Sequence, residues 1–538
     1  MWDALNVGWY RGFERWEQVE PPRGSTILSY TDYLDWRAFI DDKLAGDLKT
    51  RVESIRSADS GHPITSHAAV PGLLPSPTDG YGDPDDWKMA ETADYFGTSI
   101  YPKHAASVRP WPPTMIAAAL DFTRSSGRSY DKGFWIGELQ AGQGVTGMRI
   151  QEEVVPQDLR LWLWKVLSHG ARQISVYAWY PMSSGYESNG YGLINLDGTL
   201  TERARTAGRV AQTIAANAAE IRAAKPAPAQ VAVLYNRLAY MVGGAQSSLS
   251  KLGNAERDSL MGLHRAFFEE QIPVDFVHPQ DVIENRLGQY KIVFLPFPVM
   301  LSKNVGGSIA RYIENGGTVV AEARLAWNDE RGFSSDRVPG FGLDEVFGAR
   351  EKSIRPVEKA RIFIEPSSSL PGLRPREAIV AEAFEEDLEP MPGARVLARF
   401  SNGEAAVVEK AHGKGKAILV GSFVALAYQR QQDASTKRLL LALGRAAGVS
   451  REVESAGPGT SEVEVRRLVG ERGQFLFAFN HSGTLAQMVI SVRLPWTAGV
   501  AIDLEDSQTT PLELVAGKAA LRKTLPGKGV WVIKLAAR

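Results

Sequence analysis

The sequence predicts an α/β protein with three successive regions, the first two built from strands and helices and the last from short strands. Three observations support this fold class. Apolar strand segments alternate with helical segments, a Pro- and Ala-rich junction lies near residue 226, and a two-residue period begins near residue 455. A chain of 538 residues is also too long for a single hydrophobic core. We expect domains at 1–226, 229–447 and 455–538.

Segments rich in β-branched and aromatic residues predict the strands of the first region. They lie at 62–68, 93–102, 133–140 and 173–181. Apolar residues recur every four positions between 36 and 52, which predicts an amphipathic helix. A second, mostly buried helix is predicted at 159–167, ended by Gly170. Strands that alternate with helices pair in parallel, so this region is predicted to be α/β.

One of these strands carries a carboxylate near its C-terminal end, in the segment Gly133-Phe-Trp-Ile-Gly-Glu138-Leu-Gln. The continuous apolar run suits a strand that is buried on both faces. A carboxylate placed there costs desolvation energy unless it has a partner or a function. Glu138 is therefore a candidate catalytic residue, and the alternative is a structural carboxylate bonded to an arginine or an amide.

Composition excludes several classes of function. The formal net charge of -1 argues against a nucleic-acid or anionic-membrane partner. No apolar run is long enough for a membrane span, and the first residues lack the order of a signal peptide, so a cytoplasmic location is expected. The chain has no cysteine, which excludes disulfides and thiolate nucleophiles. Its 8 histidines are scattered, so no metal and no cofactor are expected.

The second and third regions differ in their hydrophobic period. A helix at 305–315 fits a doubly wound sheet with strands at 230–236, 290–296, 316–322 and 415–421. Gly316 and Gly317 are interpreted as a helix-to-strand turn, because no phosphate-loop pattern surrounds them. Alternating apolar residues predict a small β-sandwich with strands at 461–466, 475–479, 488–493 and 529–535. The segment 225–229 is a predicted hinge.

These segments resemble glycoside hydrolase family 42, the β-galactosidases, over nearly the whole chain. The segment 133–140 resembles the family's nucleophile motif, and 94–102 resembles the strand whose tyrosine lies near the nucleophile. The segments 179–187 and 190–198 resemble the loop after the last strand. The resemblance implies a (β/α)8-type TIM barrel, then a flavodoxin-like or class I amidotransferase-like α/β domain that mediates homotrimer contacts, and then the β-sandwich.

The resemblance also implies a retaining hydrolase of terminal β-D-galactosides, which acts on a β-galactoside oligosaccharide or a small glycoside. Glu138 would be the nucleophile, and Tyr101 would lie next to it. Glu187 would hold sugar hydroxyls, Trp179 would stack on the sugar ring, and Asn6 would bind the 2-hydroxyl. The alternatives are ordinary core or loop roles for these four residues. His67 is interpreted as a supporting residue rather than a catalytic one.

The chain departs from the family pattern at its start. The opening residues resemble the fourth barrel strand, which normally ends in Asn-Glu, but Val7 occupies the position of that glutamate, the general acid/base. Three strand-helix units are expected to precede this strand, so the barrel is predicted to be incomplete. Because valine cannot transfer a proton, activity is predicted to be impaired. The alternative is a non-catalytic carbohydrate-binding or assembly subunit. A third hypothesis, an amidotransferase-like enzyme, lacks a cysteine nucleophile.

Overall fold

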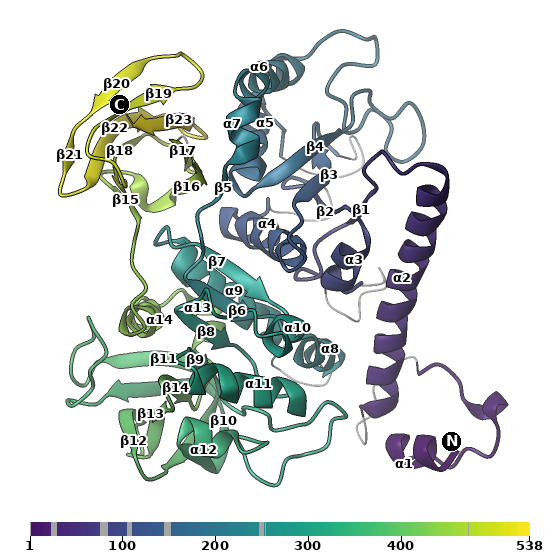
Figure 1. The fold of residues 1–538 in the computed structure, drawn as a ribbon, viewed down its shortest axis with the longest axis vertical. Helices are drawn as coiled ribbons and strands as arrows, with labels where there is room; N and C mark the ends of the chain where they lie inside the picture. The colour runs from purple at the N-terminus through teal and green to yellow at the C-terminus, as the bar shows by residue number, and fades with distance from the viewer. Residues whose placement is uncertain are drawn as a thin grey trace.

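The computed structural model describes residues 2–22, 30–75, 84–104, 110–144, 152–246, 252, 254–471 and 473–537. Figure 1 shows three groups of elements, with most of the first region at the upper right, the second region below it and the third at the upper left, while the opening helices of the first region run down the right side to the N-terminus. Within the described part of the chain, no helix has both the length and the apolar character that crossing a membrane requires.

A four-stranded parallel sheet forms the centre of the first region, in the order β1-β2-β3-β4. Its strands are β1 (Thr65–Ala68), β2 (Tyr95–Ile100), β3 (Phe134–Gln140) and β4 (Ala171–Tyr177). The helices are α3 (Asp86–Thr92), α4 (Pro113–Arg128), α5 (Pro156–Ser168), α6 (Glu202–Ala216) and α7 (Ala218–Ala223). A helix connects each strand to the next, as parallel pairing requires. The four strands predicted for 62–181 are confirmed, and so is the end of α5 just before Gly170, which has φ +100°.

The prediction of a barrel strand in the opening residues is wrong, because they form helix α1 (Trp2–Trp9). A short apolar run does not by itself distinguish a strand from a helix. Asp3 in the first turn favours the helix, and Gly8 is buried where a Cβ would lie 2.6 Å from Arg331 Nη2. A 3₁₀ helix, η1 (Trp16–Gln18), and the long α2 (Thr31–Ala58) follow. Figure 1 shows α1 at the end of α2 that lies away from β1–β4.

The second region is built on one nine-stranded mixed sheet, in the order β11-β10-β12-β13-β14-β9-β8-β6-β7. Its parallel half holds β6 (Val231–Leu234), β7 (Val274–Val277), β8 (Ile292–Leu295), β9 (Thr318–Ala321) and β14 (Gly415–Val420). Its antiparallel half holds β10 (Ala349–Ile364), β11 (Ala378–Pro390), β12 (Ala394–Phe400) and β13 (Ala405–His412). The four predicted strands are confirmed as β6, β8, β9 and β14, whereas β7 and the antiparallel half were not predicted.

Helices pack on this sheet, and several of them connect one parallel strand to the next. They are α8 (Arg237–Gln246), α9 (Ala255–Phe268), α10 (Pro279–Ile283), α11 (Lys303–Glu314), α12 (Leu343–Phe347), α13 (Val424–Gln431) and α14 (Ala434–Ala446). Helix α11 confirms the helix predicted at 305–315. Gly316, with φ +114°, begins the turn from α11 into β9, as the sequence predicted.

Two antiparallel sheets form the third region, in the orders β15-β18-β22-β21 and β20-β19-β23-β17-β16-β5. Their strands are β15 (Val453–Ala456), β16 (Val463–Gly470), β17 (Gly473–Asn480), β18 (Ala486–Arg493), β19 (Gly499–Asp503), β20 (Thr509–Leu512), β21 (Leu514–Val515), β22 (Lys518–Leu525) and β23 (Val530–Ala537), with a 3₁₀ turn η2 (Thr460–Glu462). Side chains from both sheets pack into one hydrophobic cluster, which includes Leu476, Ile490 and Ile533.

The segment predicted as a hinge is part of this third region. It forms strand β5 (Lys225–Pro226), which pairs antiparallel with β16 through Leu468 and Val469. Close by, the two ends of the second region meet, because Gln230 Nε2 donates to the Ser450 carbonyl at 3.0 Å and Ser450 N donates to Gln230 Oε1 at 3.1 Å. The second region therefore begins and ends at one place.

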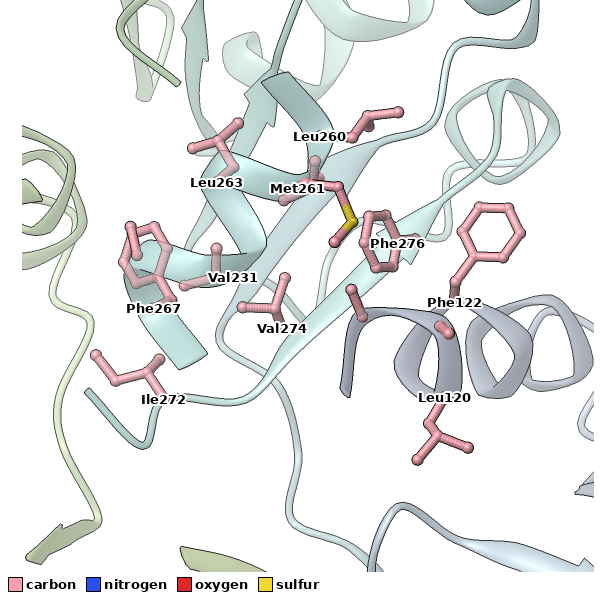
Figure 2. Close-up of a cluster of buried hydrophobic side chains, with 14 of the residues drawn as sticks. Leu120, Phe122, Val231, Leu260, Met261, Leu263, Phe267, Ile272, Val274 and Phe276 are labelled. Atoms are coloured by element: carbon pink, nitrogen blue, oxygen red, sulfur yellow. The ribbon is translucent and has the colours of Figure 1, made fainter. Parts of the chain in front are cut away.

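The first and second regions share a continuous hydrophobic core. Figure 2 shows Phe122 of α4 beside Phe276 of β7, with Met261 of α9 reaching toward Phe276 from the other side. Phe122 is fully buried and makes an edge-on contact with Phe276 at 5.4 Å between ring centroids. Helix α4 therefore covers both its own sheet and the edge strand of the neighbouring sheet.

Buried charged side chains join all three regions beside this core. We name them the Asp121–Glu464 cluster, which consists of Asp121, Lys165, His169, His264, Glu464, Arg466 and His481. Asp121 Oδ1 accepts from Arg466 Nη2 at 2.7 Å, and Asp121 Oδ2 accepts from His264 Nε2 at 3.0 Å. Glu464 accepts from His481 Nε2 at 2.8 Å and pairs with Lys165, whose side chain is fully buried.

His169 lies between the two carboxylates of the cluster. Its Nδ1 is 2.8 Å from Asp121 Oδ1, and its Nε2 is 3.1 Å from Glu464 Oε1. Arg466 Nη2 also lies 3.1 Å from His169 Nδ1, so the guanidinium approaches both the imidazole and the Asp121 carboxylate. Burial opposes ionisation of Glu464, but Lys165, His169 and His481 outweigh it and hold the pKa of this carboxyl well below its usual value.

We predict that Glu464→Gln destabilises the chain and weakens the dependence of its stability on acid. The substitution leaves Lys165 buried without its counter-charge, which costs about 3–5 kcal/mol. Because the pKa of Glu464 is depressed in the folded state, its contribution is present above the unfolded-state value of about 4.3 and is lost as the pH falls below it. Urea unfolding between pH 3 and pH 7 measures both effects. The exposed neighbour variant Glu462→Gln is the control, and an equal acid sensitivity in both variants would contradict this role.

Candidate active site

Glu138 projects from strand β3 near the C-terminal end of the parallel sheet. Strand β3 continues for two residues beyond it, to Gln140. In the pairing with β2, Thr98 lies opposite Ile136 and Ser99 lies opposite Glu138, so Gly137 is an extra, unpaired residue. Such a bulge changes the direction of the side chain that follows it. The Glu138 side chain is 36% exposed, although its neighbours Ile136 and Leu139 are fully buried.

Two hydroxyls hold one oxygen of Glu138. Tyr101 Oη donates to Glu138 Oε2 at 2.7 Å, and Ser99 Oγ donates to the same oxygen at 3.3 Å. Burial, followed by the hydrogen bond to Glu138, raises the pKa of Tyr101, so that its phenol stays protonated and remains a donor. The other oxygen, Oε1, forms no hydrogen bond within the described ranges. The structure therefore brings Glu138 and Tyr101 together and leaves one carboxylate oxygen open.

An imidazole faces this open oxygen. His67 of β1 places Nε2 3.9 Å from Glu138 Oε1, and its side chain is 27% exposed. The interpretation of His67 as a supporting residue stays a prediction, because its ring faces Glu138 but donates and accepts no hydrogen bond among the residues that the structure describes.

Aromatic rings form one wall beside Glu138. Tyr101 makes edge-on contacts with Tyr177 and Tyr191, at 6.3 and 5.8 Å between ring centroids. His104 stacks on Tyr191 at 6.0 Å, and its Nε2 lies 2.8 Å from the Tyr191 hydroxyl. Sequence reasoning missed Ser99, Tyr177 and Tyr191. The period of a strand offered one signal, because Ser99 lies two residues before Tyr101 and so shares its face.

Buried polar contacts support the loop that follows β2. Gln140 Oε1 accepts from the backbone N of Lys103 at 2.8 Å, and Gln140 Nε2 donates to the Gly142 carbonyl at 3.0 Å. Lys103 Nζ donates to Asp158 Oδ2, also at 2.8 Å. These bonds connect the end of β3 to the residues just after Tyr101, so they fix the tyrosine relative to Glu138.

Two further predicted residues lie in the loop after β4. Glu187 is half-buried, and no hydrogen bond or ion pair of its side chain occurs within the described residues. It lies close enough to Tyr177 to affect it, because burial first, then Glu187 and Glu138, raise the pKa of that phenol. Trp179 is 60% exposed and its neighbour Tyr180 is 46% exposed. Glu187 therefore lies near the Tyr177 ring of the candidate site, whereas Trp179 is an exposed indole in the same loop.

The structure does not bring the predicted residues of the opening segment to this site. Asn6 lies in α1, where its amide donates to the Phe13 carbonyl at 2.9 Å and its oxygen accepts from Phe13 N at 2.8 Å. Val7, the predicted acid/base position, is 73% exposed in the same helix. Across the described ranges, no group of three or more His, Cys, Asp or Glu side chains is arranged to hold a metal ion.

Two family models match the chain. The model described as "Beta-galactosidase" matches residues 2–217, and the model described as "Beta-galactosidase trimerisation domain" matches residues 229–450. Together they span the parallel sheet β1–β4 and the whole nine-stranded sheet. The curated relatives include Beta-galactosidase LacZ of Heyndrickxia coagulans, 25% identical over 88% of this chain and 66% of the relative. Beta-galactosidase BglY of Alicyclobacillus acidocaldarius is 22% identical over 86% and 65%.

Solved structures share the fold. The β-galactosidase from Bacillus circulans sp. alkalophilus superposes with a TM-score of 0.81 and 20% identity over 100% of this chain and 74% of that chain. A catalytic mutant of Gan42B, a GH42 β-galactosidase from G. stearothermophilus, gives 0.78 and 18% over the same shares. The first region is thus part of a TIM-barrel-like catalytic domain, with additional domains after it. This chain spans just under two thirds of the length of the two curated relatives. With both models and these relatives in agreement, the chain belongs to glycoside hydrolase family 42.

Proposed function

We propose that this chain hydrolyses terminal β-D-galactosides with retention of configuration, with Glu138 as the nucleophile. The observation that carries the proposal is the arrangement of its two oxygens. Tyr101 and Ser99 hold Oε2, while Oε1 is open toward a half-exposed site. The curated relatives are β-galactosidases, which supports a galactoside as the substrate.

In this proposal Glu138 Oε1 attacks the anomeric carbon and forms a covalent galactosyl-enzyme, which water then hydrolyses. Tyr101 donates to Oε2 and orients the ionised carboxylate for attack, because a hydrogen bond to an ionised group is shorter and stronger than a neutral one. Glu187 would bind sugar hydroxyls, and Trp179 would stack on the sugar ring. The Tyr101–Tyr177–Tyr191 wall would exclude water from one side of the anomeric centre.

A second candidate function is a non-catalytic carbohydrate-binding or assembly subunit. The position of Val7 favours it, because an exposed aliphatic side chain in α1 supplies no proton for the leaving group. The hydrogen bonds from the Tyr101 and Ser99 hydroxyls to Glu138 favour the catalytic function, since a binding subunit has no need of an oriented carboxylate.

The proposed function includes a finer view of the architecture. We divide the chain into a partial barrel at 1–226, a class I amidotransferase-like α/β domain at 229–447 and a β-sandwich at 455–538. The parallel half of the nine-stranded sheet and the shared core of the two antiparallel sheets support this view. The amidotransferase likeness concerns the fold only, because the chain has no cysteine.

We predict that Glu138→Gln lowers the turnover of nitrophenyl β-galactoside by at least about 10³-fold, since the amide cannot form the covalent intermediate. Steady-state kinetics give this value. A 2-fluoro galactoside followed by peptide mass spectrometry should label Glu138 in the native chain. Glu202→Gln, at the exposed start of α6, is the matched control. A labelled peptide that lacks Glu138 would assign the nucleophile elsewhere, and galactose binding without labelling would favour the binding subunit.

We predict that Tyr101→Phe lowers kcat/KM by about 10- to 100-fold, because a hydrogen bond to a charged group contributes about 1.5–3 kcal/mol. The aromatic contacts with Tyr177 and Tyr191 remain in this variant, so its unfolding temperature should change little. Tyr95→Phe, at the other end of β2, is the control. Equal kinetics in both variants would show that the Tyr101 hydroxyl does not support the nucleophile.

We predict that the chain is a homotrimer, on the basis of the match of residues 229–450 to a trimerisation domain. Light scattering coupled to gel filtration should then give three times the chain mass of 58.8 kDa. A mass that stays at one chain over a hundredfold range of concentration would refute the trimer.

A further inference from the structure

The third region is connected to the candidate active site through one buried carboxylate, Asp158. This residue lies in the first turn of α5. Its Oδ2 accepts from Lys103 Nζ at 2.8 Å, and its Oδ1 pairs with Lys528 Nζ, also at 2.8 Å. Lys528 belongs to the turn between β22 and β23. A single carboxylate therefore joins a lysine beside the candidate site to a lysine of the third region.

Lys103 follows Tyr101 by two residues, and both its backbone and its side chain are held. Its backbone N donates to Gln140 Oε1 at 2.8 Å, at the end of β3. The residue between them is Pro102, whose ring fixes φ and makes the segment stiff. The Lys103 side chain is 7% exposed. Burial opposes its charge, but Asp158 outweighs burial and raises the pKa of this ammonium, so the ion pair restrains the segment that carries Tyr101.

The third region also holds the helix that carries Asp158. Arg160 Nη2 donates to the Val530 carbonyl at 3.0 Å, and Trp164 Nε1 donates to Glu505 Oε1 at 3.1 Å. Trp164 is fully buried. The first two turns of α5 therefore take their position from contacts with the third region.

We propose that Lys528 is a positioning residue for the galactosidase reaction, and this inference rests on the proposed function. Lys528 holds Oδ1 of Asp158, so that Oδ2 of the same carboxylate is presented to Lys103. The held Lys103 segment in turn keeps the Tyr101 hydroxyl on Glu138. A displacement of a reacting group by about 1 Å lowers a rate by up to about 10²-fold, so a restraint outside the site affects turnover.

The test is a double-mutant cycle of Lys528→Gln with Tyr101→Phe, measured as kcat on nitrophenyl β-galactoside per site labelled by a 2-fluoro galactoside. Lys528→Gln alone should lower kcat by about 3- to 10-fold, as expected for a residue that acts on a site through others. In the Tyr101→Phe background the same change should lower kcat by less than about twofold, because the hydroxyl through which it acts is absent. Lys528→Arg should keep at least about half of the native kcat, since a guanidinium also pairs with a carboxylate.

Lys518→Gln is the matched control, because Lys518 is a similarly exposed lysine of the third region that pairs with Glu454 of the same region. It should behave like the native chain in both backgrounds. Lys528→Met, which keeps the aliphatic length of the side chain, replaces the glutamine variant in the same cycle if that variant does not fold by circular dichroism.

Two results would overturn the inference and leave the labelling of Glu138, and hence the proposed function, intact. An equal loss with and without the Tyr101 hydroxyl would show that Lys528 acts by another route. A native kcat per labelled site would show that Lys528 contributes to stability alone. A native chain without turnover or labelling overturns both the inference and the proposed function.

Discussion

The structure depends most on the pairing of buried charges at the junction of its three regions. Asp121 and Glu464 come from regions that are separated by the whole second region in the sequence, yet His169 lies between them. A buried carboxylate without a partner costs several kcal/mol, so the helices and strands that carry these groups must meet in one arrangement. The chain has no disulfide that could share this task. The hydrophobic contact of α4 with β7 buries apolar side chains between the first and second regions, and the charges specify its register.

The buried charges affect the geometry of the candidate site through two helices of the first region. Helices α4 and α5 carry Asp121, Lys165 and, just after α5, His169, and they are the connections that lead into and out of β3. With both helices held, β3 has a fixed position between β2 and β4, and the bulge at Gly137 sets the direction of Glu138. The position of the open oxygen of Glu138 therefore depends on packing that lies far from the site. The site itself needs few strong contacts, which keeps it half-exposed and accessible.

Local sequence patterns predicted those elements whose structure depends mainly on residues close in the chain. The strands β1–β4, helix α5 and its end at Gly170 follow from hydrophobic period and turn chemistry, and Glu138 and Tyr101 follow from strand ends and the family motif. Tertiary contacts decide the remainder. The opening helix α1 packs Gly8 against Arg331, a contact that no short window of sequence contains. The packing of His67 in β1 against Gly137 in β3, where a Cβ would lie 2.3 Å from the imidazole, depends on two different strands, and the strand β5 exists only because β16 lies beside it.

The meeting of Gln230 with Ser450 makes the second region an insertion with a single point of entry. The two Gln230–Ser450 hydrogen bonds bridge 220 residues of chain, and the strand pair β5–β16 lies just outside them. A pulling force applied between the first and third regions passes across this short bridge and across the Asp121–Glu464 cluster, which joins the two regions directly, instead of along the nine-stranded sheet. The second region can therefore vary in length without lengthening the connection between its neighbours.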